Sequence, residues 1–367
     1  MNQILIHFRK FDWLLTGAVF LLMGIGLLSL FSLSDVGVFP FFKRQVLWSA
    51  VGITLMIGAS LVDFRIFRTQ GFLVFLFYVG AVGLLALVLL STAIRGVEGW
   101  FRFGSVLIQP VEFTKIVLII LFAKFFSKRH VEIYRVQHLL VSWFYLFIPL
   151  ILVLAQPDLG SAIILVSIWV GVVLFSGMRL RHFFVLVAIG FLVGSLGWQF
   201  ALEPYQKNRI TAFLSPYEDP KGAGYQMIQS MIAVGSGQVW GKGIGYGSQS
   251  HLNFLPEAQT DFIFAAFAEE WGFVGVLVVL VLYLVLLWRI IVIGWSSVDN
   301  FSRLYALGFA AFIFVQSVIH IGMNMGLLPI TGITLPFVSY GGSSLVALFI
   351  GVGILQNIKI NSRKGIE

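Results

Sequence analysis

The chain has 367 residues, of which 59% are hydrophobic and only 11% are charged, and its formal net charge is +8. Soluble chains carry roughly 25% charged residues, so this composition excludes a water-soluble globular protein. There are no cysteines, which excludes disulfides, thiol catalysis and cysteine-based metal sites.

Ten stretches of the chain approach the length of about 20 mostly apolar residues that a membrane-spanning helix needs. The first follows Arg9 and Lys10 and continues past signal-peptide length without a small-residue cleavage site, so it is predicted to be a retained span. We therefore expect an all-α fold, a polytopic bundle of about ten transmembrane helices that forms a single domain over 1–367. In chain order the stretches are 12–33, 45–62, 70–91, 111–127, 139–156, 159–177, 182–201, 270–293, 304–325 and 342–358.

The basic residues are unevenly distributed between the two ends of these stretches. With the N-terminus placed inside, 15 of the 24 Lys and Arg fall in inner segments, as is typical of cytoplasmic loops. An even number of spans puts both termini on one side, so an N-in/C-in orientation is predicted. The positive charge is thus a topology signal, and no soluble basic domain is present that would bind nucleic acid.

The segment 202–261, between spans seven and eight, is predicted to be a long outer loop. It is about sixty residues long, and loops of this length without obvious regular structure are usually functional or disordered. Its aromatic residues favour an ordered loop that packs on the bundle. These are Tyr205, Phe213, Tyr217, Tyr225, Trp240, Tyr246 and Phe254.

Specific strings stand in this loop and at the outer ends of the spans. They are QPVEFTK at 109–115, QPDLG at 156–160, NR at 208–209, DPKGAGYQ at 219–226, GSG at 235–237, GKG at 241–243, FLPE at 254–257, TDFIFA at 260–265 and LPFVSYGGSS at 335–344. In combination and order they resemble the SEDS family of RodA, FtsW and SpoVE proteins, over nearly the whole chain. QSHL at 249–252 and the run from Asn324 to Gly332 are most similar to the RodA branch. Val111 and Gln238 depart from the family pattern, which expects Ser and Gly there.

This resemblance implies a peptidoglycan glycosyltransferase of the bacterial cytoplasmic (inner) membrane, with its active site facing outward. It would polymerise lipid II into a nascent glycan strand by inverting transfer, with undecaprenyl diphosphate as the leaving group, during cell elongation and shape maintenance. The implied partners are a class B penicillin-binding protein (a transpeptidase) and elongation-complex proteins such as MreC and MreD.

Asp261 is the leading catalytic candidate. A glycosyl transfer needs a base that accepts the proton of the attacking hydroxyl, and a carboxylate can do this. Asp261 stands where the polar loop meets an apolar helical run, and the resemblance places the essential aspartate here. The alternative is a helix N-cap, a position that Asp favours. A second alternative is that Asp261 is a candidate ligand of a divalent cation, Mg²⁺ or Mn²⁺; the sequence does not identify the metal, and no organic cofactor is expected.

Glu112 and Lys115 are three residues apart on one helix face, near the outer end of the fourth stretch. Charged groups at such depth are costly and usually line a cavity. Two interpretations remain open: a polar wall of the substrate cavity, or a structural ion pair that closes the bundle.

Other polar residues interrupt the apolar stretches. Asp158 is interpreted as a structural N-cap. Glu269 and Glu270, and the pair His320 and Asn324, suggest inward polar faces. A metal site on His320 is not expected, because the usual His and Cys spacing is missing.

The loop also carries groups suited to a lipid-linked sugar diphosphate. Arg209, Lys242 and Lys221 could contact phosphates, with Arg209 the leading candidate; the alternative is a set of solvated surface charges. Neutral side chains could bind sugar hydroxyls or could serve capping and packing. The remaining substrate-binding candidates are Gln226, Gln229, Ser230, Gln249, Glu257 and Ser339, the last expected in a wall of the site that is mainly structural.

Two other function classes fit ten spans with charged groups. A lipid II flippase is the main rival, but a transporter places its site near the midplane and often has internal repeats, whereas these polar groups crowd on one side. A non-catalytic scaffold is disfavoured by the density of charge in the loop. Within the family, a division or sporulation paralogue remains an alternative to the elongation enzyme.

Overall fold

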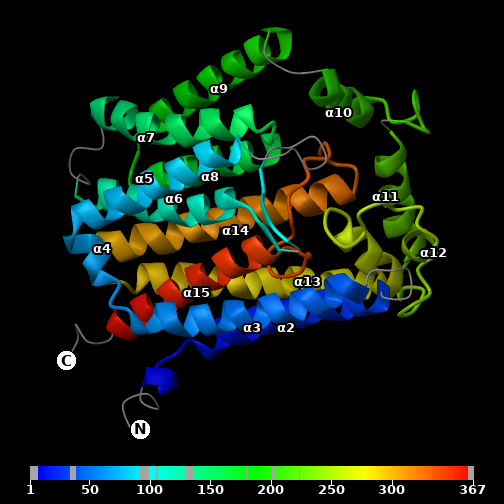
Figure 1. The fold of residues 1–367 in the computed structure, drawn as a ribbon, viewed down its shortest axis with the longest axis horizontal. Helices are drawn as coiled ribbons and strands as arrows, with labels where there is room; N and C mark the ends of the chain where they lie inside the picture. Colours follow the sequence, from blue (N-terminus) through cyan, green and yellow to red (C-terminus); the bar gives the residue numbers. More distant parts are fainter. Residues whose placement is uncertain are drawn as a thin grey trace.

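The computed structural model describes residues 7–33, 39–90, 99–104, 106–128, 136–178, 180–200, 204–222 and 224–362. These residues form a helical bundle whose longer helices run roughly side by side (Figure 1). The helices are α2 (Trp13–Ser32), α3 (Phe39–Leu61), α4 (Arg65–Thr69), α5 (Gly71–Val88), α6 (Pro110–Ser127), α7 (Val136–Ala155), α8 (Leu159–Phe175), α9 (Leu180–Phe200), α10 (Pro204–Leu214), α11 (Tyr225–Ser236), α12 (Ser248–His251), α13 (Ile263–Trp295), α14 (Asn300–Asn324) and α15 (Gly342–Ser362).

Each of the ten predicted stretches overlaps one of these helices. Among the described residues, seven helices are long and apolar enough to cross a membrane: α2, α3, α5, α7, α13, α14 and α15. Of the others, α8 is apolar but shorter, and α6 carries Glu112, Lys115 and Lys124. The polytopic helical fold is thus confirmed, while the count of ten spans and the N-in/C-in orientation stay predictions.

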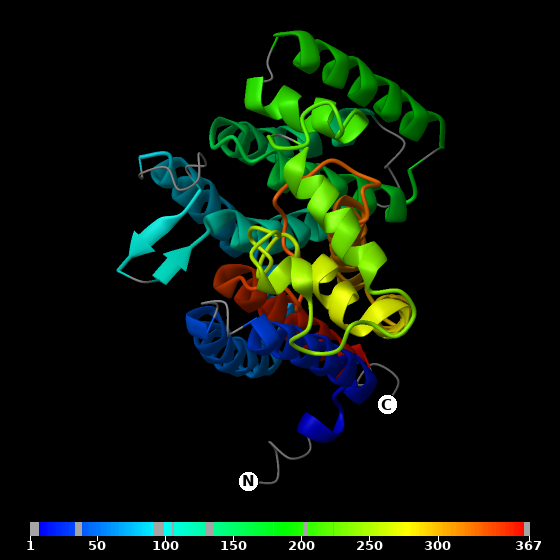
Figure 2. The same ribbon diagram turned by 90° about the vertical axis from the view of Figure 1, so that its right-hand side faces the viewer.

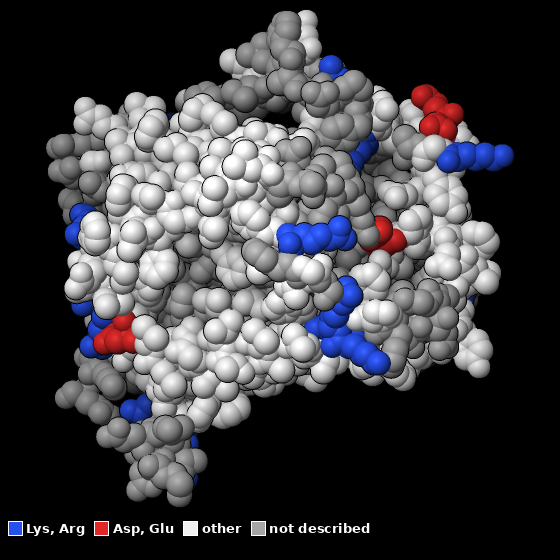
Figure 3. All heavy atoms as spheres, in the orientation of Figure 1, with Lys and Arg blue, Asp and Glu red and all other residues white. Residues whose placement is uncertain are grey.

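Some of the basic residues from which the N-in/C-in orientation was predicted lie outside the described residues. They are Arg95, Arg129, Arg135, Arg179, Arg363 and Lys364. In the face shown in Figure 3, a broad uncharged surface separates charged side chains at the left edge from those on the right. A band without charged side chains is expected of a surface that contacts lipid.

The structure adds a β-hairpin that the all-α prediction did not contain. Strands β1 (Phe101–Phe103) and β2 (Val106–Ile108) are antiparallel, with Phe101 opposite Ile108. The strands have three residues each, too few for an alternating pattern to be recognised in the sequence. The hairpin leads directly into α6.

Helices α14 and α15 form the centre of the bundle and are buried over most of their length. Helix α15 packs along α3, and α14 packs against α13, α8 and α6. Small residues allow this close approach: a Cβ on Gly351 would lie 2.3 Å from the Phe309 ring, and one on Gly308 would lie 2.7 Å from Val172. Glycine at helix contacts is typical of membrane bundles, where van der Waals packing drives association.

Within its described residues, the predicted long loop 202–261 contains helices α10, α11 and α12. Residues 202, 203 and 223 lie outside the described set. Helix α11 buries Met227, Ser230 and Ala233, which share one face because they are three residues apart. With this face it packs on α13 and α14. Figure 2 looks onto this end of the molecule, with α11 and the yellow-green loop in front.

Helix α13 begins earlier than the predicted stretch 270–293 and is interrupted at Gly272, which has φ 62° and ψ −163°. The loop satisfies the backbone groups that this break exposes. The amides of Phe273 and Val274 donate to the carbonyls of Gln238 and Val239 at 2.8 and 3.1 Å. On the other side of the break, the Glu269 and Glu270 carbonyls each accept at 3.0 Å from the amides of Lys242 and Gly243.

Glycines make this close docking possible. A Cβ on Gly272 would lie 2.2 Å from the Gly241 nitrogen, and one on Gly241 would lie 2.1 Å from the Glu270 carbonyl oxygen. The part of α13 after the break would alone be about 34 Å long at 1.5 Å per residue, enough to cross a hydrocarbon core of about 30 Å. The part before the break belongs with the loop.

Candidate active site

Asp261 lies immediately before α13, at the junction that the sequence analysis singled out. The N-cap of this helix is Phe262, and no side-chain capping bond is formed there. The Asp261 side chain is therefore not the helix cap. It is partly exposed, and its Oδ2 atom is 3.7 Å from the position that a Cβ on Gly332 would occupy. The Asp261 carboxylate thus lies beside the connection between α14 and α15.

A tight turn before Asp261 sets the direction of the chain. Glu257, with φ 58°, accepts through its carbonyl from the amides of Thr260 and Phe262 at 3.0 and 3.3 Å. Its carboxylate accepts from the Thr260 hydroxyl at 3.2 Å and from the Gln259 amide group at 3.3 Å. These hydrogen bonds all join residues of the turn 257–262, which contains Asp261.

The connection between α14 and α15 binds this turn from the other side. The Ser339 hydroxyl donates to the Thr260 carbonyl and accepts from the Leu335 amide, both at 2.8 Å. The Tyr340 amide donates to the Gln259 carbonyl at 3.0 Å. Ser339 thus links two segments next to Asp261, in keeping with a structural wall of the site.

Glu112 and Lys115 form a buried ion pair with a distance of 2.7 Å. The Lys115 ammonium also lies 5.5 Å from the centre of the Phe312 ring. Glu112 Oε2 is buried and has no hydrogen-bond partner among the described residues. One carboxylate oxygen is therefore paired, and the other is buried without a partner among the described residues.

Asp158 caps α8, as expected, by accepting from the Ser161 amide at 2.9 Å and the Ser161 hydroxyl at 2.6 Å. Burial raises the pKa of the Asp158 carboxyl above its ordinary value, and the bonds from Ser161 and the nearby Lys115 oppose this rise. Gly160 packs on the same connection that borders Asp261, since a Cβ there would lie 2.6 Å from the Thr331 carbonyl oxygen. The 331–333 segment is therefore next to both the start of α8 and the Asp261 carboxylate.

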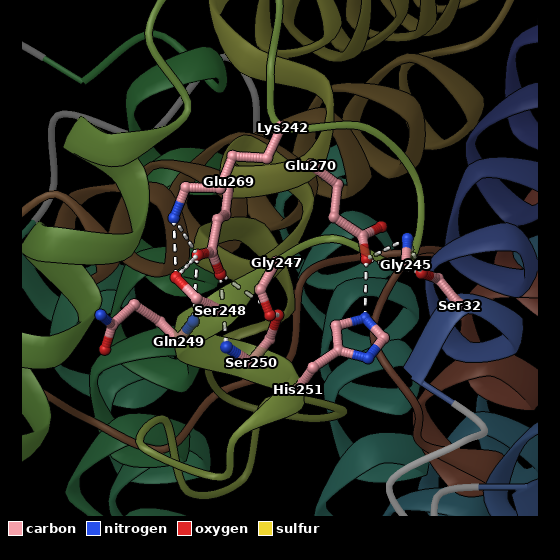
Figure 4. Close-up of polar contacts among 10 residues, drawn as sticks. All are labelled: Ser32, Lys242, Gly245, Gly247, Ser248, Gln249, Ser250, His251, Glu269 and Glu270. Atoms are coloured by element: carbon pink, nitrogen blue, oxygen red, sulfur yellow. Dashed lines mark hydrogen bonds and ion pairs between the residues drawn. The ribbon is translucent and has the colours of Figure 1, made fainter.

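Lys242 and Glu269 centre a second polar cluster, shown in Figure 4, which joins the loop to α13. Lys242 Nζ lies 2.7 Å from Glu269 Oε1. The fully buried Glu269 carboxylate also accepts from the amide and hydroxyl of Ser250, the hydroxyl of Ser248 and the amide of Gln249. Lys242, predicted to contact phosphate, thus has a carboxylate partner, while 29% of its side chain stays exposed.

Glu270 makes the neighbouring contacts in Figure 4. Its Oε1 atom accepts from the Gly245 amide at 3.1 Å and lies 3.1 Å from His251 Nε2. It also accepts from the hydroxyl of Ser32, at the end of α2. The inward polar partners expected for Glu269 and Glu270 therefore come mostly from the loop. Ser32 was missed by sequence reasoning, because no local pattern marks a residue that far away in the chain.

The remaining predicted residues lie on the helices of the loop. Arg209 is exposed on α10, and Gln226 and Gln229 are partly buried on α11. Ser230 is fully buried, and its hydroxyl donates to the Asn324 carbonyl at 2.8 Å. Gln249 Oε1 is buried and has no partner among the described residues. No group of three or more His, Asp or Glu that could bind a metal ion occurs in the part of the chain that the structure describes.

Fold and site together define a multi-pass membrane protein in which clusters of charged and polar side chains join a helical loop to one end of the bundle. The chain belongs to the FTSW_RODA_SPOVE family of cell cycle proteins, whose model matches residues 10–364. This confirms the SEDS resemblance found in the sequence. It is accordingly a multi-pass protein of the bacterial cytoplasmic membrane.

Its relatives include several branches of this family. The chain is 38% identical to "Stage V sporulation protein E" of Bacillus subtilis (strain 168), over 96% of this chain and 98% of that protein. It is 37% identical to "Peptidoglycan glycosyltransferase MrdB" of Escherichia coli (strain K12), over 88% of this chain and 86% of that protein. It is 36% identical to "Probable peptidoglycan glycosyltransferase FtsW" of Tolumonas auensis, over 96% and 93%.

Solved structures agree with the fold. A chain of a peptidoglycan synthase complex, described for the structural coordination of polymerization and crosslinking, aligns with a TM-score of 0.81 and 31% identity, over 96% of this chain and 98% of that one. The rod shape determining protein RodA of Thermus thermophilus aligns with a TM-score of 0.70 and 28% identity, over 95% and 96%. An aspartate-to-alanine mutant of the same RodA aligns with a TM-score of 0.71 and 28% identity, over 95% and 97%.

Proposed function

We propose that this chain is a peptidoglycan glycosyltransferase that polymerises lipid II on the outer face of the cytoplasmic membrane. The position of Asp261 carries the proposal: its carboxylate is partly exposed at the start of α13, and it does not cap that helix. Family membership over residues 10–364 supports the reaction class, because relatives named as glycosyltransferases align over most of their length.

In the proposed reaction, a sugar hydroxyl of one lipid-linked disaccharide attacks the anomeric carbon at the end of the growing strand. A new glycosidic bond forms with inversion, and the bond to undecaprenyl diphosphate breaks, its electron pair leaving with the diphosphate. Asp261 accepts the proton of the attacking hydroxyl, as a general base does.

The leaving diphosphate needs positive charge to stabilise it. Arg209 is exposed on α10, and Lys242 retains an exposed fraction beside Glu269. Because Glu269 balances the charge of Lys242, we propose a divalent cation as a further source of positive charge. Asp261 would be its protein ligand. Water and diphosphate oxygens would complete the coordination, as is usual for Mg²⁺.

We further propose that the partner is a class B penicillin-binding protein, because the chain aligns over 96% of its length with a member of a peptidoglycan synthase complex. An elongation role, with MreC and MreD, rests on narrower grounds. The identities to the sporulation and MrdB relatives are nearly equal, so the QSHL string at 249–252 and the segment from Asn324 to Gly332 carry this part of the proposal. Expression in cells depleted of either RodA or FtsW tests it: restored rod shape is expected in the first, and restored septation only in the second would contradict it.

Polymerisation of labelled lipid II by the purified chain, with and without a transpeptidase partner, tests the activity. Wild type should form glycan polymer, and Asp261→Ala should form none. Asp299→Ala is a matched control, because Asp299 caps α14 through Ser302; it should lose about 1 kcal/mol of stability and keep activity. Equal polymer from wild type and Asp261→Ala would exclude the role of Asp261. Transport of lipid II across vesicles without polymer would favour the flippase.

A further inference from the structure

The side chain of Asn324, in the last turn of α14, joins the two sides of the Asp261 junction. It is fully buried. Its amide nitrogen donates to the carbonyl of Asp261 at 2.9 Å and to the carbonyl of His320 at 2.8 Å. Its amide oxygen accepts from the backbone amide of Ala265 at 3.1 Å. A side-chain amide has two N–H donors and one acceptor oxygen, so each kind of group is used.

The bond to Ala265 has a specific meaning for α13. The first amides of a helix have no partner within the helix, and an Asn, Asp, Ser or Thr at the N-cap normally accepts from the second or third of them. Here the N-cap is Phe262, which has no acceptor in its side chain, and Ala265 is the third helical residue. Asn324 therefore supplies from another helix the bond that an N-cap side chain normally provides.

The same side chain fixes the backbone of Asp261. The Asp261 carbonyl is bound to Asn324, and the Thr260 carbonyl just before it is bound to Ser339. Asn324 is itself fixed, because its own carbonyl accepts from the buried Ser230 hydroxyl of α11 at 2.8 Å. Three helices, α11, α13 and α14, thus meet at this one asparagine.

We infer that Asn324 is a positioning residue for Asp261. By capping α13 from outside, it takes over a role for which the neighbouring carboxylate would be the obvious candidate. By binding the Asp261 carbonyl, it sets where that carboxylate stands relative to the Gly332 segment. The inference rests on the proposed function, since it presumes that Asp261 is the base.

Asn357 provides a matched control at the opposite end of the bundle. It is also buried, and its amide nitrogen donates to the Ser60 carbonyl at 2.7 Å. Its amide oxygen accepts from the Phe64 backbone amide at 3.2 Å. Both asparagines therefore connect a carbonyl and an amide of a neighbouring segment, but Asn324 alone contacts the residue proposed as the base.

Asn324→Asp and Asn357→Asp should be compared in the full-length protein. Each change keeps the size and one acceptor but removes both N–H donors, so that an oxygen faces carbonyl oxygens. Both variants should lose thermal stability to a similar extent. Asn324→Asp should lower kcat for lipid II polymerisation by about 10- to 100-fold, the loss expected when a reacting group is displaced by about 1 Å. Its KM should stay within about threefold of wild type, while Asn357→Asp should keep its kcat.

The outcomes separate the two claims. If Asp261→Ala polymerises like wild type, the proposed role of Asp261 fails. If Asp261→Ala is inactive but Asn324→Asp keeps its kcat, or loses no more than Asn357→Asp, the positioning role alone is overturned. If Asn324→Asp does not fold, Asn324→Ser, which keeps one hydroxyl donor, is compared with Asn357→Ser by the same measurements. Equal kcat of these two variants would also overturn the inference.

Discussion

Lys242 Nζ lies 2.7 Å from Glu269 Oε1, and this ion pair joins the long loop to the part of α13 that precedes Gly272. The carboxylate is fully buried and accepts from loop donors on both oxygens. The pair is therefore the centre of a structural connection, and any contact of Lys242 with a diphosphate must occur with Glu269 already bound to it.

Removing Glu269 should cost more stability than removing Lys242. Glu269→Ala leaves several buried donors and an ammonium group without their acceptor, and breaking a buried pair in this way costs about 3–5 kcal/mol. Lys242→Met leaves a carboxylate that the Ser250 and Gln249 amides still bind, so a loss of about 1 kcal/mol is expected. Thermal unfolding in detergent checks this order. A larger loss for Lys242→Met would contradict it.

The Glu112–Lys115 pair should show strong coupling between its members. Both side chains are buried, so Lys115→Met leaves a buried charge without its partner and should destabilise more than the double variant Glu112→Gln/Lys115→Met. Lipid II polymerisation by the double variant then separates the two open interpretations. Loss of activity with regained stability is expected if Glu112 lines the substrate cavity. Full activity would mean that the pair only closes the bundle.

Gly272→Ala should disrupt the docking of the loop. Its φ of 62° disfavours an L side chain, and the new Cβ would lie 2.2 Å from the Gly241 nitrogen. We expect a destabilisation of about 2 kcal/mol or more, from backbone strain and steric overlap together, and a loss of polymer formation. Gly80→Ala in α5 is the control, since nothing lies within 4 Å of its Cβ position. It should be neutral or stabilising by about 0.5–1 kcal/mol; an equal loss in both variants would refute the explanation.

A divalent cation at Asp261 should be detectable by its removal. Polymerisation should fall at least about tenfold in excess EDTA, because one ion can supply several kcal/mol of charge stabilisation. It should recover when Mg²⁺ or Mn²⁺ is added in excess over the chelator. Asp261→Asn should raise the Mn²⁺ concentration needed for any residual activity. An unchanged rate in EDTA would exclude the cation and leave Arg209 and Lys242 as the proposed cationic groups.

Much of the architecture followed from the sequence, because membrane helices are marked by long apolar runs. Each of the ten stretches overlaps a helix, and Asp158 caps α8 as expected. The break in α13 was not predicted, since the apolar pattern continues through Gly272. The break depends on backbone bonds to residues 238–243 of the loop, and a hydropathy pattern does not contain these.

The sequence by itself determined the membrane class and the family, and it predicted a long loop that ends at a catalytic Asp261. These properties reside in composition and in short strings, which are local. Only the tertiary structure decided that Asp261 does not cap α13, because the capping bond comes from Asn324 on another helix. It also decided that Lys242 has a carboxylate partner and that Ser32 belongs with Glu270. Such partners are chosen by packing between distant segments, so no local pattern records them.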